Sequence, residues 1–131
     1  MVGILNLSEG STIALHAVLH LAKGGGKTIT TAEAADVMKV SAAHLSKIFQ
    51  RLAKSGIVKP VRGPKGGYLL SRPLTEIRLF DVFEAIEGPL KLGRGAGAPQ
   101  RCSVDGCQLP AMLDEINKQV VQRFEKKLSE L

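Results

Sequence analysis

Two helix-start signals stand close together in the first half of the chain, and they constrain the fold more than any other feature. Thr30 precedes Glu33 by three residues, the spacing of a capping box, and the alanine-rich stretch TAEAADVM continues from it as a short helix. After a turn of about three residues, Ser41 is a second N-cap, and AAHLSKIFQRLAKSG places apolar side chains on one face before it ends at Gly56. Two helices joined by so short a turn predict a helix-turn-helix.

The segments on either side fit a domain built around this pair of helices. Upstream, STIALHAVLHLAK repeats apolar residues at helical spacing and stops at the glycines 24–26. Downstream, residues 57–61 and 68–70 are β-prone and flank a turn at 63–67, which predicts a β-hairpin. A helix-turn-helix followed by a hairpin predicts a winged helix, so the expected fold class is mainly α with a small β-hairpin wing.

These patterns divide the chain into three regions. Residues 1–87 form the predicted winged helix-turn-helix domain, because LTEIRLFDVFEAIEG adds a further helix that packs back on the core. Residues 88–109 are rich in Gly and Pro and contain both cysteines, so we expect a functional loop. Residues 110–131 begin with a proline at a helix start and carry an apolar stripe to Leu131, which predicts a long helix and a homodimer formed through it.

Charge is segregated along the chain. The net charge is +6, yet the stretch 37–72 contains eight of the eighteen lysines and arginines and none of the twelve acids. A solvated protein surface normally mixes the two signs. The segregation therefore favours contact with a polyanion, and we expect double-stranded DNA as the partner.

Other classes of protein are disfavoured by the same sequence. The apolar runs are shorter than a bilayer span and the first residues lack the pattern of a signal peptide, so we expect a cytoplasmic protein with no membrane partner. In VRGPKGGYLL, the lysine is not followed by Ser or Thr at the start of a helix, as a phosphate-binding P-loop requires. No Ser, His and Asp or Cys and His arrangement indicates catalysis, and we expect no enzyme activity.

The basic stretch contains the candidate DNA contacts. The outward face of the second helix carries Ala43, Ser46 and Lys47 near its start, where a recognition helix normally reaches base edges. The other predicted DNA contacts are Ser41, His44, Arg51, Lys54, Arg62, Pro64, Lys65, Gly66 and Gly67. Arg62 stands where an arginine can enter a narrow minor groove, and the two glycines of the wing allow the backbone to approach the DNA.

The segment SAAHLSKIFQRLAKSGIVKPVRGPKGGYLLSRPLTEIRLFDVFEAIEG resembles the helix-turn-helix and wing of the IscR, NsrR and CymR type of bacterial transcription regulators, the Rrf-two family, whose hallmark is an Arg-Gly-Pro-X-Gly-Gly-Tyr wing. The resemblance implies a homodimeric regulator, most often a repressor, that binds operator DNA through helix and wing. Ser41 and Arg62 match the family's helix-start serine and wing arginine. Ala43 and Ser46 differ from the serine and glutamate of the cluster-biogenesis regulator, so its operator preference does not transfer.

The same resemblance implies that the cysteine loop is a sensor. Cys102 and Cys107 resemble the second and third cysteines that hold an iron–sulphur cluster in some members; the first has no counterpart, and Pro110 stands where the cluster-biogenesis regulator has a histidine. In some members a first-helix histidine and glutamate from the partner subunit complete the ligand set. His16 resembles that histidine, whereas Thr12 occupies the glutamate's place. Because imidazole can replace thiolate on one iron, the implied cofactor is a [2Fe–2S] cluster on Cys102, Cys107 and His16.

Other interpretations of these residues stay open. Cys102 and Cys107 can instead form a reversible disulfide or react singly as thiols, helped by the nearby charge of Arg101. Alternatively, the chain is a cluster-free regulator, or a protein-binding module of the same fold, controlled by a partner protein or a small ligand. His16 then lies under the dimer interface with no metal role.

Overall fold

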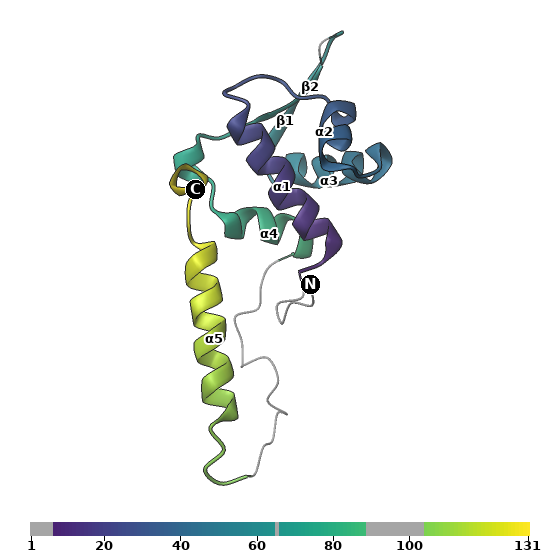
Figure 1. The fold of residues 1–131 in the computed structure, drawn as a ribbon. Helices are drawn as coiled ribbons and strands as arrows, with labels where there is room; N and C mark the ends of the chain where they lie inside the picture. Colours follow the sequence, from purple (N-terminus) through teal and green to yellow (C-terminus); the bar gives the residue numbers. More distant parts are fainter. Residues whose placement is uncertain (1–6, 65, 89–103) are drawn as a thin grey trace.

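The computed structural model describes residues 7–64, 66–88 and 104–131, and Figure 1 shows how they are arranged. The elements in chain order are α1 Glu9–Lys23, α2 Thr31–Met38, α3 Ala42–Lys54, β1 Val58–Val61, β2 Gly67–Leu70, the 3₁₀ turn η1 Leu74–Glu76, α4 Leu79–Glu87, α5 Leu109–Phe124 and the 3₁₀ turn η2 Leu128–Glu130. Helices α1 to α4 and the antiparallel hairpin form one domain, and α5 extends from its side. The predicted class, mainly α with a hairpin wing, is confirmed.

The helices of the helix-turn-helix begin at the predicted caps. Thr30 Oγ1 accepts the Glu33 amide at 3.0 Å, and the Glu33 carboxylate accepts the Thr30 amide at 3.3 Å, which completes the capping box. Ser41 Oγ accepts the His44 amide at 3.1 Å. Between the two helices, Lys39 takes the left-handed conformation with a φ of 55°. These caps satisfy amides at the helix starts that have no intrahelical partner, so both ends are fixed locally.

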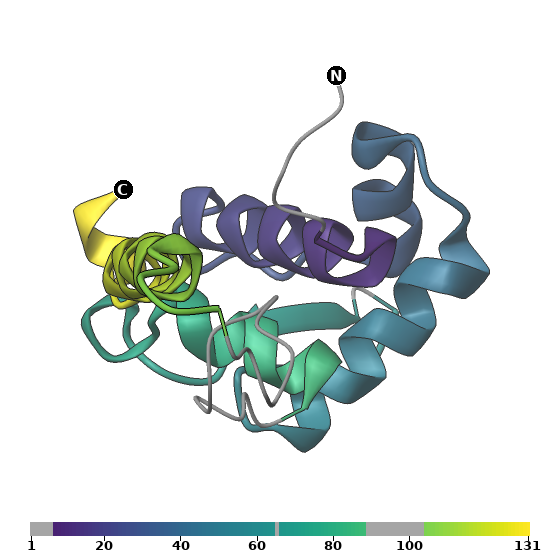
Figure 2. The same cartoon turned by 90° about the horizontal axis from the view of Figure 1, so that it is seen from below.

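The core lies where the apolar faces of α1, α3 and α4 meet. The buried residues of α1 and α3 are the ones predicted from helical spacing: Ile13, Ala14, Ala17, Val18 and Leu21, and Leu45, Ile48, Phe49 and Leu52. From the α4 side, Ile77 and Val82 are fully buried against them. In the view from below, α5 is seen end-on at one side of this domain, and α2 and α3 lie at the opposite side (Figure 2).

The hairpin is fastened to the domain near its base. Val58 of β1 pairs with Leu70 of β2, and Tyr68 forms an isolated antiparallel bridge with Ile29. In this bridge the Tyr68 amide donates to Ile29 O at 2.9 Å, and the Ile29 amide donates to Tyr68 O at 3.1 Å. The Tyr68 ring also stacks on Phe49 of α3, with ring centroids 4.5 Å apart. The wing and α3 are therefore packed directly on each other.

The last helix is shorter than the apolar stripe of the sequence predicted. It ends at Phe124, not at Leu131, and the chain then turns back toward α4. Leu128, expected on the stripe of the helix, is only 4% exposed in the core instead. Its amide donates to Ile77 O at 2.9 Å. Burial of this leucine in the domain core, together with that hydrogen bond, favours the turn over further helix.

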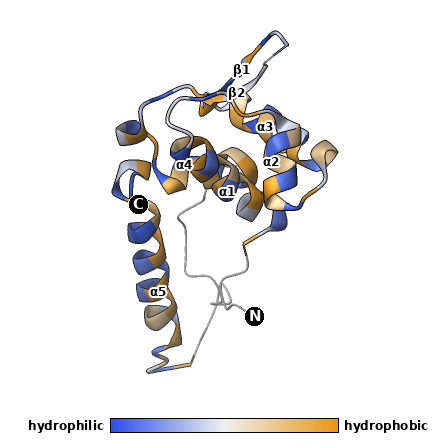
Figure 3. Ribbon diagram, turned by 45° about the horizontal axis from the view of Figure 1, so that its top comes forward, coloured by the Kyte–Doolittle hydropathy of each residue, from blue (hydrophilic) through white to orange (hydrophobic). Residues whose placement is uncertain are grey.

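The apolar face of α5 is open. No residue of this helix is buried, and Leu109, Met112 and Ile116 are each about half exposed, at 50%, 53% and 46%. Figure 3 shows the first turns of the helix extending away from the other elements, with hydrophobic residues along its length. Within the described ranges, no helix combines the length and apolarity needed to cross a membrane.

Candidate nucleic-acid interface

One face of α3 is turned away from the core and carries the residues predicted to reach bases. Ala43 and Lys47 are exposed, and Ser46 is partly exposed. Their direction follows from helical period, because the residues that point the other way are in the core. The helix contains no acid, and Lys54, its last residue, is exposed. The face thus presents positive charge and small side chains, which suits a helix that enters a major groove.

The wing presents a second set of predicted contacts. Arg62 and Pro64 are exposed at the turn between β1 and β2. The wing and the start of α2 border one hollow of about 520 Å³, lined by Thr31 and Arg62 among others. Lys65, also predicted to contact DNA, lies outside the described residues. The structure therefore brings Arg62 beside the start of α2, the first helix of the helix-turn-helix.

The structure gives a steric reason for the two wing glycines that the sequence did not reveal. A Cβ added to Gly67 would lie 2.4 Å from Ile29 O, and one added to Gly66 would lie 2.6 Å from Val61 O. Both distances are far inside a normal van der Waals contact. Gly67 is therefore required by the packing of the wing on its domain and Gly66 by the turn of the wing itself, whereas their close approach to DNA stays a prediction.

Two of the predicted phosphate contacts make bonds inside the protein. Ser41 caps α3 by accepting the His44 amide, and its hydroxyl hydrogen is left for another acceptor. Arg51 Nη1 donates to Ile86 O at 3.2 Å, at the end of α4. The guanidinium of Arg51 is thus held against α4, at the edge of the basic face.

The candidate sensor residues are separated within one chain. Cys107 is exposed in the segment before α5. The start of α5 is the end of this helix that lies farther from the domain (Figure 1). Cys102 lies outside the described residues. α1, which carries His16, lies apart from the start of α5 in Figure 1. The fold of one chain therefore does not bring His16 and Cys107 together.

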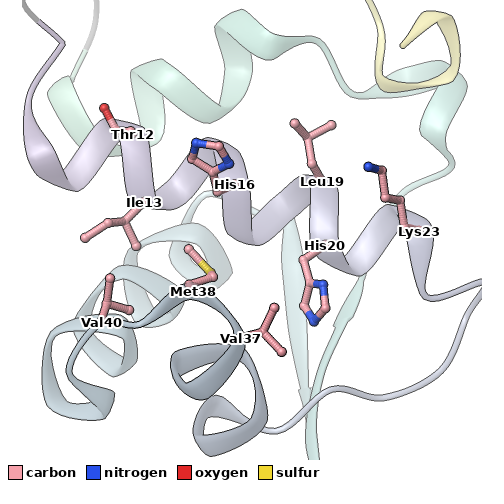
Figure 4. A pocket seen from close by; sticks show the side chains of 9 residues that line it. All are labelled: Thr12, Ile13, His16, Leu19, His20, Lys23, Val37, Met38 and Val40. Carbon is pink, nitrogen blue, oxygen red and sulfur yellow. The ribbon is translucent and has the colours of Figure 1, made fainter. Parts of the chain in front are cut away.

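His16 lines a groove between α1 and α2 with a volume of about 650 Å³. The polar part of its wall also contains Thr12, His20 and Lys23. In Figure 4, His16 and His20 leave α1 in different directions, so the two imidazoles do not converge. Sequence reasoning missed this groove, because the apolar wall that α2 supplies depends on how the two helices pack.

The donors in the described part of one chain do not by themselves fit an iron–sulphur cluster. Such a cluster needs four ligands, and thiolates are its usual ones. Among residues 7–64, 66–88 and 104–131, no three His, Cys, Asp or Glu side chains form a group that could hold a metal. A cluster would therefore need Cys102 or donors from a second chain.

Comparison with known proteins was made on sequence and on structure. Residues 7–131 match the family model of Rrf2, described as an iron-dependent transcriptional regulator. Over 98 residues the chain is 36% identical to the HTH-type transcriptional regulator IscR of Cereibacter sphaeroides, a match that spans 72% of this chain and 63% of that relative. It is 35% identical over 111 residues to protein aau3 of Rhizobium meliloti, spanning 83% of this chain and 72% of the relative.

Solved structures with the same fold were also found. CymR (YrzC), the global cysteine regulator of B. subtilis, superposes with a TM-score of 0.76 at 24% identity, over 96% of this chain and 95% of the other. T. potens IscR superposes with a TM-score of 0.74 at 25% identity, over 96% and 85% of the two chains. The winged-helix fold predicted from the sequence is thus the fold of these proteins.

Proposed function

Because this chain belongs to the Rrf2 family of DNA-binding transcriptional regulators, which are not enzymes, we propose that it is a homodimeric repressor that senses iron–sulphur or redox state. The observation that carries the DNA-binding part is the unit formed by α3 and the wing, in which Tyr68 stacks on Phe49. It belongs to the stretch 37–72, which has eight basic residues and no acid. A segment of this composition attracts phosphate, because it adds positive charge and no carboxylate that would repel the phosphate.

The geometry of α3 and the wing supports a contact in two neighbouring grooves. The start of α3 enters the major groove, where Ser46 and Lys47 reach base edges and Ser41 contacts the backbone. Arg62 enters the adjacent minor groove, whose negative potential favours a guanidinium. The stack of Tyr68 on Phe49 keeps the wing at a fixed place relative to α3, so the two groove contacts are made together.

The open face of α5 supports the dimer. An exposed apolar stripe on a helix that leaves its own domain is stabilised when a second protein surface covers it. A second copy covers it with two-fold symmetry, which also places two α3 helices on a palindromic operator.

The sensing part rests on the cysteine segment and on the groove of α1. In a dimer, Cys102 and Cys107 of one chain and His16 of the other would supply donors to one site, whereas within one chain α1, which carries His16, lies apart from Cys107 at the start of α5. The bound cluster would supply a redox-active iron centre. Exposure of Cys107 favours a second candidate, a thiol sensor, because an accessible thiolate is also open to oxidants.

One preparation tests these parts separately. The protein is purified without oxygen, and its visible absorption and its iron and sulphide content are measured for the wild type and for Cys102→Ala, Cys107→Ala and His16→Ala. His20→Ala is the matched control, because His20 lines the same groove but points elsewhere. Loss of colour and iron in the first three variants but not in the control supports the shared cluster. A colourless, iron-free wild type overturns it, and oxidant-dependent DNA affinity would then support the thiol sensor.

The DNA-binding part has its own test. Duplexes are selected by the wild-type protein from a random-sequence pool, and affinity for the selected duplex is followed as salt rises. We expect a linear fall of log affinity against log salt, with a slope near one for each phosphate contact. A wild type that enriches no duplex, or binds without salt dependence, would rule out the DNA-binding function.

A further inference from the structure

The end of α4 is held by the last turn of α3. Arg51 Nη1 donates to Ile86 O at 3.2 Å. Ile86 belongs to the last turn of α4, where backbone carbonyls lack an intrahelical donor. A cation at this end of a helix also interacts favourably with the helix dipole. Arg51 therefore caps α4 from the side of the helix predicted to read DNA.

The same helix end is held by the first turn of α1. Glu87 Oε1 accepts from Ser11 Oγ at 2.6 Å and also from Ser8 Oγ. Ser8 is the N-cap of α1, and Ser11 is fully buried. The hydrogen bonds from Ser11 and Ser8, with a smaller contribution from the charge of Arg51, lower the pKa of Glu87. The last residues of α4 thus join α1 to α3.

We propose that Arg51 is a positioning residue of the DNA-reading helix and not one of its phosphate contacts. Arg51 fixes the orientation of α3 on α4 through Ile86 O, and Ser11 supports the same point through Glu87. The proposal rests on the proposed DNA-binding function. Loss of the Arg51 contact lets α3 shift, and a shift weakens contacts to base edges more than contacts to phosphates, which tolerate a wider range of positions.

The test compares two substitutions that remove one positive charge from the end of α3. Arg51→Gln is measured beside Lys54→Gln, because Lys54 is exposed and predicted to touch phosphate. Each protein is titrated with the duplex selected by the wild type and with a scrambled duplex of the same length and composition, over a series of salt concentrations. For Lys54→Gln we expect the salt slope to fall by about one on both duplexes.

For Arg51→Gln we expect a different pattern. Affinity for the selected duplex falls by about three- to tenfold, as for loss of one hydrogen bond, whereas affinity for the scrambled duplex and both salt slopes stay as in the wild type. A slope lower by about one, with equal losses on the two duplexes, would make Arg51 a phosphate contact and overturn the proposal. An unchanged ratio of the two affinities would overturn it as well.

A second variant keeps the test decisive if Arg51→Gln unfolds the protein. Ser11→Ala changes no charge and lies in the core, yet it loosens the same helix end through Glu87. We expect a smaller loss confined to the selected duplex, and, in the double variant, a loss below the sum of the two single losses. If Ser11→Ala leaves the ratio of affinities unchanged, α4 does not position α3. If the wild type itself selects no duplex, the proposed DNA-binding function fails instead.

Discussion

Gly67 and Tyr68 are neighbours in β2, and both contact other parts of their own domain. The backbone of Ile29 approaches Gly67 so closely that no side chain fits, and the ring of Tyr68 lies on Phe49. Arg62 differs, because it is exposed at the tip of the wing. The wing motif therefore contains two kinds of residue. Gly67 and Tyr68 hold the wing on its domain, and Arg62 is exposed and can contact a ligand.

Replacement of Gly67 by alanine tests this division. We expect Gly67→Ala to lower the free energy of unfolding by about 2 to 3 kcal/mol, because its Cβ would lie 2.4 Å from Ile29 O and the backbone must move. Gly25→Ala is the control: φ is +63° there but nothing lies within 4 Å of the added Cβ, so only about 1 kcal/mol is lost. Urea unfolding curves measure both, and equal losses would contradict the steric explanation.

Among the elements, α4 and the segment after α5 are joined by one ionic cluster. Arg78 Nη2 lies 2.8 Å from Asp81 Oδ1, and Arg78 Nη1 lies 2.7 Å from Glu125 Oε2. Asp81 Oδ2 also accepts the Arg78 amide at 2.9 Å, which caps the start of α4. Burial raises the pKa of Asp81, but the hydrogen bonds and charge of Arg78 outweigh it, so the pKa lies below its usual value. The cluster therefore needs an ionised Asp81.

This cluster predicts an acid-sensitive contribution to stability. A carboxyl whose pKa is lower in the folded state stabilises the fold fully above its unfolded pKa, near 4, and the contribution is lost as pH falls through the folded value. We expect Asp81→Asn to lower the free energy of unfolding by about 1 to 2 kcal/mol at pH 7 and to converge with the wild type at acid pH, once Asp81 is protonated in the folded protein as well. Denaturant unfolding over this pH range measures it. Asp114→Asn, on the exposed part of α5, is the control and should change the free energy of unfolding at pH 7 by less than about 0.5 kcal/mol.

For the whole molecule, we propose that the arrangement of α5 decides the oligomeric state. Its apolar stripe begins at Leu109 and includes Met112 and Ile116, all about half exposed. The end of the helix is anchored, because Leu128 behind it is buried in the domain. A rigidly held helix with an open apolar side is the surface through which we propose that two chains associate.

Substitution on the stripe tests the dimer directly. Ile116→Glu places a charge in the proposed interface, so we expect sedimentation equilibrium to give a monomer where the wild type gives a dimer. Gln122→Glu adds the same charge on the polar side of α5 and should remain dimeric. A wild type that sediments as a monomer, or a dimer that survives Ile116→Glu, would exclude α5 as the interface.

Local patterns were enough to predict the elements of the domain. The caps at Thr30 and Ser41, the apolar spacing of α1 and α3, and the turn of the wing all depend on residues a few positions apart, and each is found where it was predicted. The charge count over 37–72 likewise required only the order of residues. Short-range hydrogen bonds and helical periodicity can be predicted directly from the order of residues.

The tertiary structure alone decided which residues meet across the chain. Three features depend on residues that are far apart in the sequence. They are the end of α5 at Phe124, the contact of Arg51 with Ile86, and the groove beside His16. Apolar periodicity predicted a helix to Leu131, since Leu128 fits the stripe as well as it fits the core. From the sequence alone, burial of Leu128 against another helix and burial in the domain core are equally favourable. Only the folded domain shows that Leu128 packs in the core and that its amide donates to Ile77 O.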